Sequence, residues 1–130
     1  MKNTIFKLLE YSYYFSLLIL FVLYLFPGSL IGYLLYENLG QQPDLISNPI
    51  GTSINHLIFF VYLSTLGSTA RLRNKNFLNS FSFLFFLSIL LELSHLLIPS
   101  RAFEYYDLFA NSIGVMIAYL LINIFLKLKN

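Results

Sequence analysis

Four long apolar runs divide this chain of 130 residues, and each is bounded by polar or turn-forming residues. They cover residues 5–26, 54–70, 77–98 and 108–126. A helix needs about 20 apolar residues, with a range of roughly 17 to 25, to cross the hydrocarbon core of a bilayer. The sequence is 58% hydrophobic and 11% charged, which is more apolar than a water-soluble core of this size could bury. We therefore predict an all-α integral membrane protein, a four-helix bundle forming a single domain over residues 1–130.

The basic residues predict how these runs are oriented. When the runs cross the membrane alternately, Arg101 falls on one side and every other basic residue on the opposite side: Lys2, Lys7, Arg71, Arg73, Lys75, Lys127 and Lys129. Short cytoplasmic loops are enriched in Lys and Arg. We therefore expect both termini in the cytoplasm and the opposite end facing outward.

Three local features refine this topology. The first run is expected to be a permanent span, because residues 26–28, Phe-Pro-Gly, lack the small-x-small pattern of a signal-peptidase site. Residues 29–36 are apolar but too few to span, so we expect a short interfacial or re-entrant helix after the first span. Tyrosines near the ends of the runs are predicted to lie in the lipid headgroup layer, namely Tyr11, Tyr13, Tyr14, Tyr24, Tyr105 and Tyr106.

Ionisable residues of the C-terminal half gather in one stretch. Helical spacing puts Glu92 and His95 on one face near the outer end of the third run, and Asp107 and Asn111 on one face of the fourth. A carboxylate facing lipid is costly, so the two faces are expected to meet in a polar pocket. We predict that Arg101 bridges Glu92 and Asp107 there. His56, at the outer start of the second run, is expected at the same level.

This constellation fits more than one kind of chemistry. Glu92 and His95 are the candidate catalytic residues for proton transfer, and the candidate substrate-binding residues are Arg101, Asp107, Asn111 and His56. The same residues would also serve only to staple two helices together. Glu92 and His95, with His56 and Asp107, are ligand types for zinc or iron. We nevertheless expect no metal and no other cofactor, because Arg101 would repel a cation. The absence of cysteine excludes disulfides, iron–sulfur clusters and thiol catalysis.

The stretch resembles the C-terminal signature of the VanZ-like family of small bacterial integral membrane proteins, Glu-x-x-Gln-x-x-x-Pro-x-Arg-x-x-x-x-x-Asp-x-x-x-Asn-x-x-Gly-x-x-x-Gly. The matching residues are Glu92, Pro99, Arg101, Asp107, Asn111 and Gly114. His95 replaces the usual Gln, and Ala118 replaces the last Gly. Residues 52–57 keep the family's His as His56 but lack its Asp-Lys pair.

The resemblance implies a location in the bacterial cytoplasmic (inner) membrane and a link to low-level resistance to teicoplanin and related lipoglycopeptides. With an outward-facing pocket, it favours binding or modification of an anionic lipid-linked envelope component. Membrane lipids are then the expected partners, and nothing indicates a nucleic acid. The alternative is a noncatalytic accessory or structural subunit of a larger membrane protein complex. The sequence leaves open whether the protein is an enzyme.

Overall fold

The computed structural model describes residues 2–43, 51 and 53–129, and in these it contains five α-helices, one short 3-10 helix and no strand. In chain order the elements are α1 (Lys2–Leu25), α2 (Leu30–Tyr36), α3 (Ser53–Arg71), η1 (Phe77–Asn79), α4 (Phe81–Ser94) and α5 (Tyr105–Lys129). The predicted all-α class is confirmed. The short helix expected over residues 29–36 is present as α2, with Ser29 as its N-cap.

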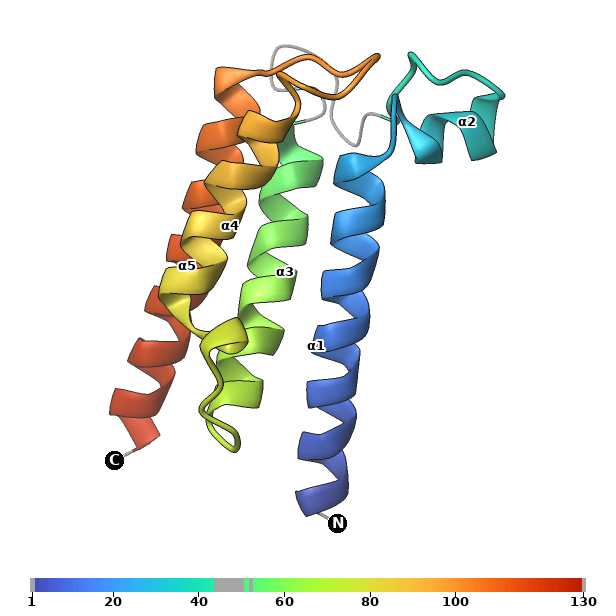
Figure 1. Cartoon of the computed structure of the whole chain (residues 1–130). Coiled ribbons are helices and arrows are strands. Elements are labelled where there is room, and N and C mark those ends of the chain that lie inside the picture. The colour runs from blue at the N-terminus through green and yellow to red at the C-terminus, as the bar shows by residue number, and fades with distance from the viewer. Residues whose placement is uncertain (1, 44–50, 52, 130) are drawn as a thin grey trace.

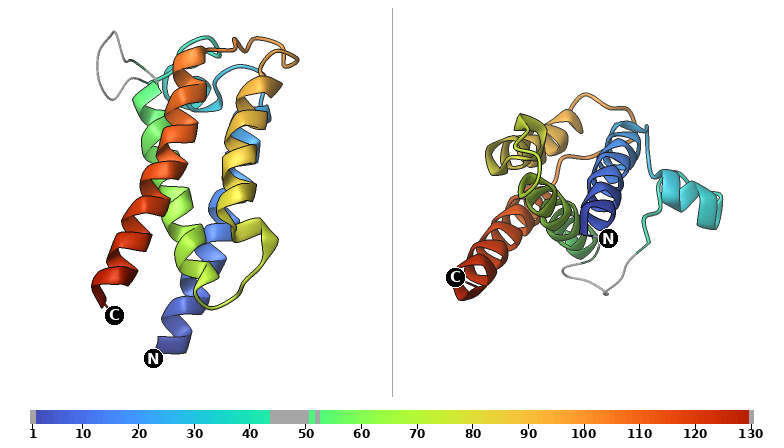
Figure 2. Two further views of the ribbon diagram at one scale, coloured as in Figure 1. Left: turned by 90° about the vertical axis from the view of Figure 1, so that its left-hand side faces the viewer. Right: turned by 90° about the horizontal axis from the view of Figure 1, so that it is seen from below.

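Four helices, α1, α3, α4 and α5, lie side by side, while α2 projects to one side (Figure 1). The closest packing joins α3 to α5, followed by α1 to α3 and α4 to α5, so α3 is the central helix (Figure 2). Both described chain ends and the link between α3 and η1 lie at one end of the molecule, which we call the basic end. The link between α4 and α5 lies at the opposite end, which we call the site end.

Within the described residues, two helices are both long and apolar enough to cross a bilayer, Thr4–Leu25 in α1 and Tyr105–Lys129 in α5. The prediction of one continuous helix over residues 77–98 is wrong. The hydroxyl of Ser80 accepts a hydrogen bond from the backbone N–H of Phe83 and so starts α4 at Phe81, separate from η1. The chain leaves α4 after Ser94 and turns before Pro99. Apolar composition alone does not reveal these two breaks.

Large apolar side chains from the four long helices fill the centre. Fully buried examples are Tyr13 and Leu20 of α1, Phe60 and Leu63 of α3, Leu84 of α4 and Val115 of α5. Gly114 allows the close approach of α5 to α3, because an added Cβ would lie 2.8 Å from the carbonyl oxygen of Leu57. Ala118, one turn further along, is also on the buried face of α5.

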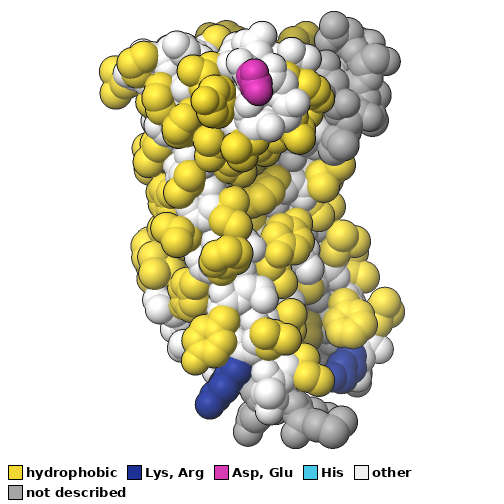
Figure 3. Space-filling view, turned by 90° about the vertical axis from the view of Figure 1, so that its right-hand side faces the viewer, with side chains coloured by type: hydrophobic (Ala, Val, Ile, Leu, Met, Phe, Trp, Pro, Cys, Tyr) yellow, Lys and Arg dark blue, Asp and Glu magenta, His cyan; other side chains and the backbone are white. Residues whose placement is uncertain are grey.

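Apolar side chains also cover much of the outer surface between the two ends. Figure 3 shows this on one face, with basic side chains near the basic end and an acidic one near the site end. Exposed examples include Phe15, Leu18, Phe86, Leu90 and Phe125. An apolar surface this extensive suits contact with lipid rather than water.

Candidate functional site

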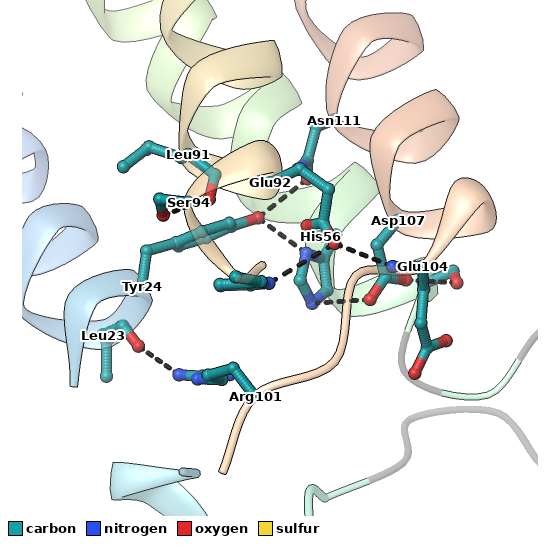
Figure 4. A network of polar contacts seen from close by, with 12 residues as sticks. Leu23, Tyr24, His56, Leu91, Glu92, Ser94, Arg101, Glu104, Asp107 and Asn111 are labelled. Carbon is teal, nitrogen blue, oxygen red and sulfur yellow. Dashed lines mark hydrogen bonds and ion pairs between the residues drawn. The ribbon is translucent and has the colours of Figure 1, made fainter. Parts of the chain in front are cut away.

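The predicted site residues come from three helices and one link at the site end. His56 lies in the first turns of α3, Glu92 and His95 at the end of α4, and Asp107 and Asn111 in the first turns of α5. Arg101 lies in the link between α4 and α5. The structure brings His56, Glu92, His95, Asp107 and Asn111 into one buried network, and Arg101 lies beside it (Figure 4).

Tyr24, at the end of α1, is the residue that joins this network together. Its hydroxyl donates to Oδ1 of Asn111 over 2.8 Å and lies 2.6 Å from Nδ1 of His56. Its ring stacks on that of His95, with 5.3 Å between centroids and 18° between planes. The side chain is only 8% exposed, so its prediction as a headgroup-layer tyrosine is wrong.

The sequence did carry a signal for this inward position. Tyr24 follows Tyr13, Leu17 and Leu20 at helical spacing, and all four are buried. The same prediction is wrong for Tyr13, which is fully buried and whose hydroxyl donates a hydrogen bond to the backbone carbonyl of Leu78. Of the other two tyrosines of α1, Tyr11 is exposed and Tyr14 is partly buried.

Asp107 is buried and held from α3. Its Oδ1 accepts a hydrogen bond from the hydroxyl of Ser53 over 2.5 Å, and its Oδ2 lies 3.5 Å from Nε2 of His56. Ser53 was not predicted as part of the site. It is the first residue of α3, so the packing of α3 against α5 places its hydroxyl beside the first turn of α5.

Glu92 is completely buried and is contacted from its own helix and from the link to α5. Its Oε1 lies 3.3 Å from Nδ1 of His95, one helical turn away, as the spacing predicted. The same oxygen accepts a hydrogen bond from the backbone N–H of Glu104 over 3.1 Å. The carboxylate of Glu104 points away from the network (Figure 4). Partial burial, and the charges of Asp107 and Glu92, raise the pKa of Glu104.

Arg101 does not form the predicted bridge. Its Nε donates to the carbonyl of Phe26 over 3.2 Å, and its Nη2 donates to the carbonyl of Leu23. These carbonyls lie at the C-terminal end of α1. The last carbonyl groups of a helix have no N–H partner within the helix, and the negative end of the helix dipole lies there. Among the described side chains, Arg101 forms no ion pair with Glu92 or Asp107. Partial burial lowers its pKa.

A pocket of about 100 Å³ opens beside the network. Its polar lining includes His56, His95 and Arg101, and residues of α2 and of the segment after it complete the wall. An apolar groove of about 120 Å³ adjoins this pocket and extends to Leu20 and Phe59. The pocket and the groove share five lining residues: Leu23, Tyr24, Ile31, Asn55 and His56. A space lined in part by polar side chains therefore borders an apolar one between α1 and α3.

Comparison with known proteins supports the resemblance and extends it. No match was found among curated proteins or among solved structures. The model of the VanZ/LLP1 family matches residues 5–126, which includes most of α1 and reaches well beyond the signature stretch over residues 92–118. A match over nearly the whole chain shows that the protein belongs to the VanZ/LLP1 family.

Proposed function

We propose that this protein crosses the bacterial cytoplasmic membrane four times and presents its site end on the outer side. The four long helices would form the bundle, with η1 and the turn after α4 extending the shortest of them. Support comes from the clustering of basic residues at the basic end and from the apolar surface between the two ends. The position of α2 at the site end fits an interfacial helix in this orientation.

In this orientation the pocket receives the anionic headgroup of a lipid-linked envelope component, and the groove receives part of its chain. The observation that carries this proposal is the shared wall of pocket and groove, because a lipid needs a polar and an apolar compartment in direct continuity. Arg101 would contact the anion, since two of its donors serve α1 and its Nη1 has no hydrogen bond within the described part of the chain. Altered handling of such a lipid would account for a link to lipoglycopeptide resistance.

If the bound lipid is modified, His95 rather than Glu92 would contact it. His95 lines the pocket, whereas Glu92 is fully buried behind it and contacts Nδ1 of the His95 ring. Glu92 would then position His95 for proton transfer. Asp107 and Asn111 contact Ser53, His56 and Tyr24, so their contribution would be to hold the wall of the pocket.

Binding in nanodiscs tests this proposal. The probe is a fluorescent polyprenyl phosphate, compared with the corresponding polyprenol that lacks the phosphate. We expect Arg101→Gln to weaken phosphate-lipid binding at least tenfold, and Arg101→Lys to retain part of it. Arg73→Gln, which removes a guanidinium at the basic end, is the matched control and should bind as the wild type does. Equal binding of the two probes by the wild type would contradict the proposal.

The alternative is a noncatalytic accessory or structural subunit. One observation favours it, a second apolar groove of about 350 Å³ on the surface of α3 and α5, lined by Ile54, Leu57, Phe109 and Ile113 among others. Such a groove would accept side chains of a neighbouring membrane helix. Extraction in mild detergent should then recover a stoichiometric membrane partner, and Ile113→Trp should release it. A chain that purifies alone contradicts this alternative.

A further inference from the structure

The lipid-binding proposal does not explain why His56, Glu92 and Asp107 meet. They come from α3, α4 and α5, and each offers one ligand atom such that these atoms all lie within 4.8 Å of one another (Figure 4). Helices separated in the sequence thus direct three strong metal-ligand types to one point. This cluster of three residues lies behind the pocket, and His56 belongs to both.

In each carboxylate of the cluster, one oxygen accepts a hydrogen bond from a protein donor and the other oxygen accepts none from the described residues. Oδ1 of Asp107 accepts from Ser53, and Oε1 of Glu92 accepts from the backbone N–H of Glu104. Oε2 of Glu92 is buried and has no hydrogen-bond partner in the part of the chain that the structure describes. A buried carboxylate oxygen without a partner is rare in proteins, and an ion or an ordered water would complete its environment.

The hydrogen bonds of Tyr24 define which nitrogen of His56 carries a proton. The hydroxyl of Tyr24 has one hydrogen and donates it to Oδ1 of Asn111. Its oxygen therefore accepts from Nδ1–H of His56, 2.6 Å away. In a neutral imidazole this leaves a lone pair on Nε2, which lies 3.5 Å from Oδ2 of Asp107. Two atoms with lone pairs repel each other at this distance unless a proton or a metal ion lies between them.

The spacing of these atoms suits a metal ion. This holds for the one pair whose separation is known, His56 and Asp107. With bonds of about 2.1 Å to each atom, an ion between Nε2 of His56 and Oδ2 of Asp107, 3.5 Å apart, would form an angle of roughly 110°, close to tetrahedral. The remaining contacts match the usual surroundings of metal ligands, in which the second ring nitrogen and the second carboxylate oxygen are hydrogen-bonded. Here Tyr24, Ser53 and the backbone of Glu104 make those contacts.

Charge leads to the same conclusion. Glu92 and Asp107 are both buried, and no lysine or arginine of the described chain forms an ion pair with either. Repulsion by Arg101 was the reason to expect no metal from the sequence. That reason weakens because the guanidinium donates to the carbonyls of Leu23 and Phe26 at the end of α1. Two buried carboxylates without a fixed cation require neutralisation, which a divalent ion would provide.

From this geometry we propose that His56, Glu92 and Asp107 bind one divalent transition-metal ion of the zinc class. One imidazole and two carboxylates are ligands that Zn²⁺ accepts, and three protein ligands leave a fourth position open. Entry would occur beside His56, whose side chain is 10% exposed and lines the pocket. The proposal is independent of lipid binding and would hold even if the pocket binds no lipid.

The test uses the full chain in detergent, without added envelope lipid, after removal of metal by a chelator. Co²⁺ is added first as an optical probe, because its visible absorption depends on the number and type of its ligands. We expect one Co²⁺ per chain with the intense bands of a four-coordinate site, and displacement by one equivalent of Zn²⁺. Calorimetry with Zn²⁺ then gives the affinity. A wild-type chain that develops no such bands and binds no Zn²⁺ would overturn the proposal.

Variants identify the ligands. Glu92→Gln and Asp107→Asn keep the shape of each side chain and should weaken Zn²⁺ binding at least 100-fold. Glu104→Gln is the matched control, since it removes a carboxylate at the same end but keeps the backbone N–H that contacts Glu92. Its affinity should equal that of the wild type. An equal loss in all three variants, or none in the first two, refutes the assignment. If the first two variants fail to fold, the Co²⁺ spectrum of the wild type still decides whether the metal binds.

Discussion

At the basic end, Glu10 lies 3.8 Å from Arg73 and accepts a hydrogen bond from Asn74 over 2.9 Å, with both charged side chains partly exposed. At the site end, Glu92 and Asp107 are buried and their contacts reach three helices and a link. Both ends therefore join acidic residues to distant parts of the chain. Exposed pairs contribute little to stability because solvent and salt screen them, whereas a buried polar group that loses its partner is costly. Stability should thus respond to changes at the site end far more than at the basic end.

The largest expected difference is between two variants that each lose a tyrosine hydroxyl. Tyr24 contributes its hydroxyl to the network at the site end, and Tyr13 contributes its hydroxyl to a contact with η1. Tyr24→Phe leaves Oδ1 of Asn111 and Nδ1 of His56 without their shared partner, and should lower the free energy of unfolding by about 2 to 3 kcal/mol. Tyr13→Phe leaves a single backbone carbonyl, that of Leu78, and should cost about 1 kcal/mol. Unfolding in mixed micelles with increasing SDS measures both.

A matched control for this pair is Tyr11→Phe, because Tyr11 lies on α1 and its side chain is 70% exposed. It should unfold as the wild type does. If Tyr13→Phe proves more destabilising than Tyr24→Phe, the hydroxyl of Tyr24 does not join the network as described.

The next effect, of intermediate size, concerns two glycines that let helices approach. In Gly114→Ala the new Cβ would lie 2.8 Å from the backbone oxygen of Leu57, so α5 must move away from α3. In Gly67→Ala the nearest atoms belong to the side chains of Tyr13 and Leu84, which adjust more easily than backbone does. We expect losses of about 2 kcal/mol for Gly114→Ala and about 1 kcal/mol for Gly67→Ala, reduced in both by the better helix propensity of Ala.

The same SDS titration measures these two variants, with Ile113→Ala as the control beside Gly114. Ile113 is exposed, so its truncation should change stability by less than about 0.5 kcal/mol. A larger loss of stability for Gly67→Ala than for Gly114→Ala would contradict this expectation. It would mean that α5 moves away from α3 beside Gly114 at a lower cost than the close contact with Leu57 implies.

How much of this could be predicted from the sequence depended on the kind of interaction. The positions of α1, α3 and α5 followed from apolar runs, because the length of a membrane-crossing helix is set by the bilayer. The meeting of Glu92 with His95 followed from helical periodicity. Arg101 was placed wrongly because the competing acceptors, the carbonyls of Leu23 and Phe26, are backbone atoms that no sequence motif displays.

Tyr24 was misplaced for a different reason. Position near the end of a run suggested the headgroup layer, but its spacing from Leu17 and Leu20 placed it on the buried face of α1. Where position along a run and helical periodicity conflict, periodicity is the stronger signal, because it determines which face of the helix a side chain lies on and therefore what it packs against. Ser53 carried no comparable signal, since its contact with Asp107 depends on how α3 packs against α5.

The smallest effect is expected at the basic end, from Arg73→Gln. The Nη1 of Arg73 and the Oε2 of Glu10 are 3.8 Å apart, and the arginine side chain is 33% exposed, so the pair is screened by water. We expect a loss below about 0.5 kcal/mol at low ionic strength, which disappears in high salt. The control is Glu10→Gln, which removes the same pair from its other side and should give a similar small change. A loss in either variant that persists in high salt would mean that this pair acts as a buried one does, and the contrast between the two ends would fail.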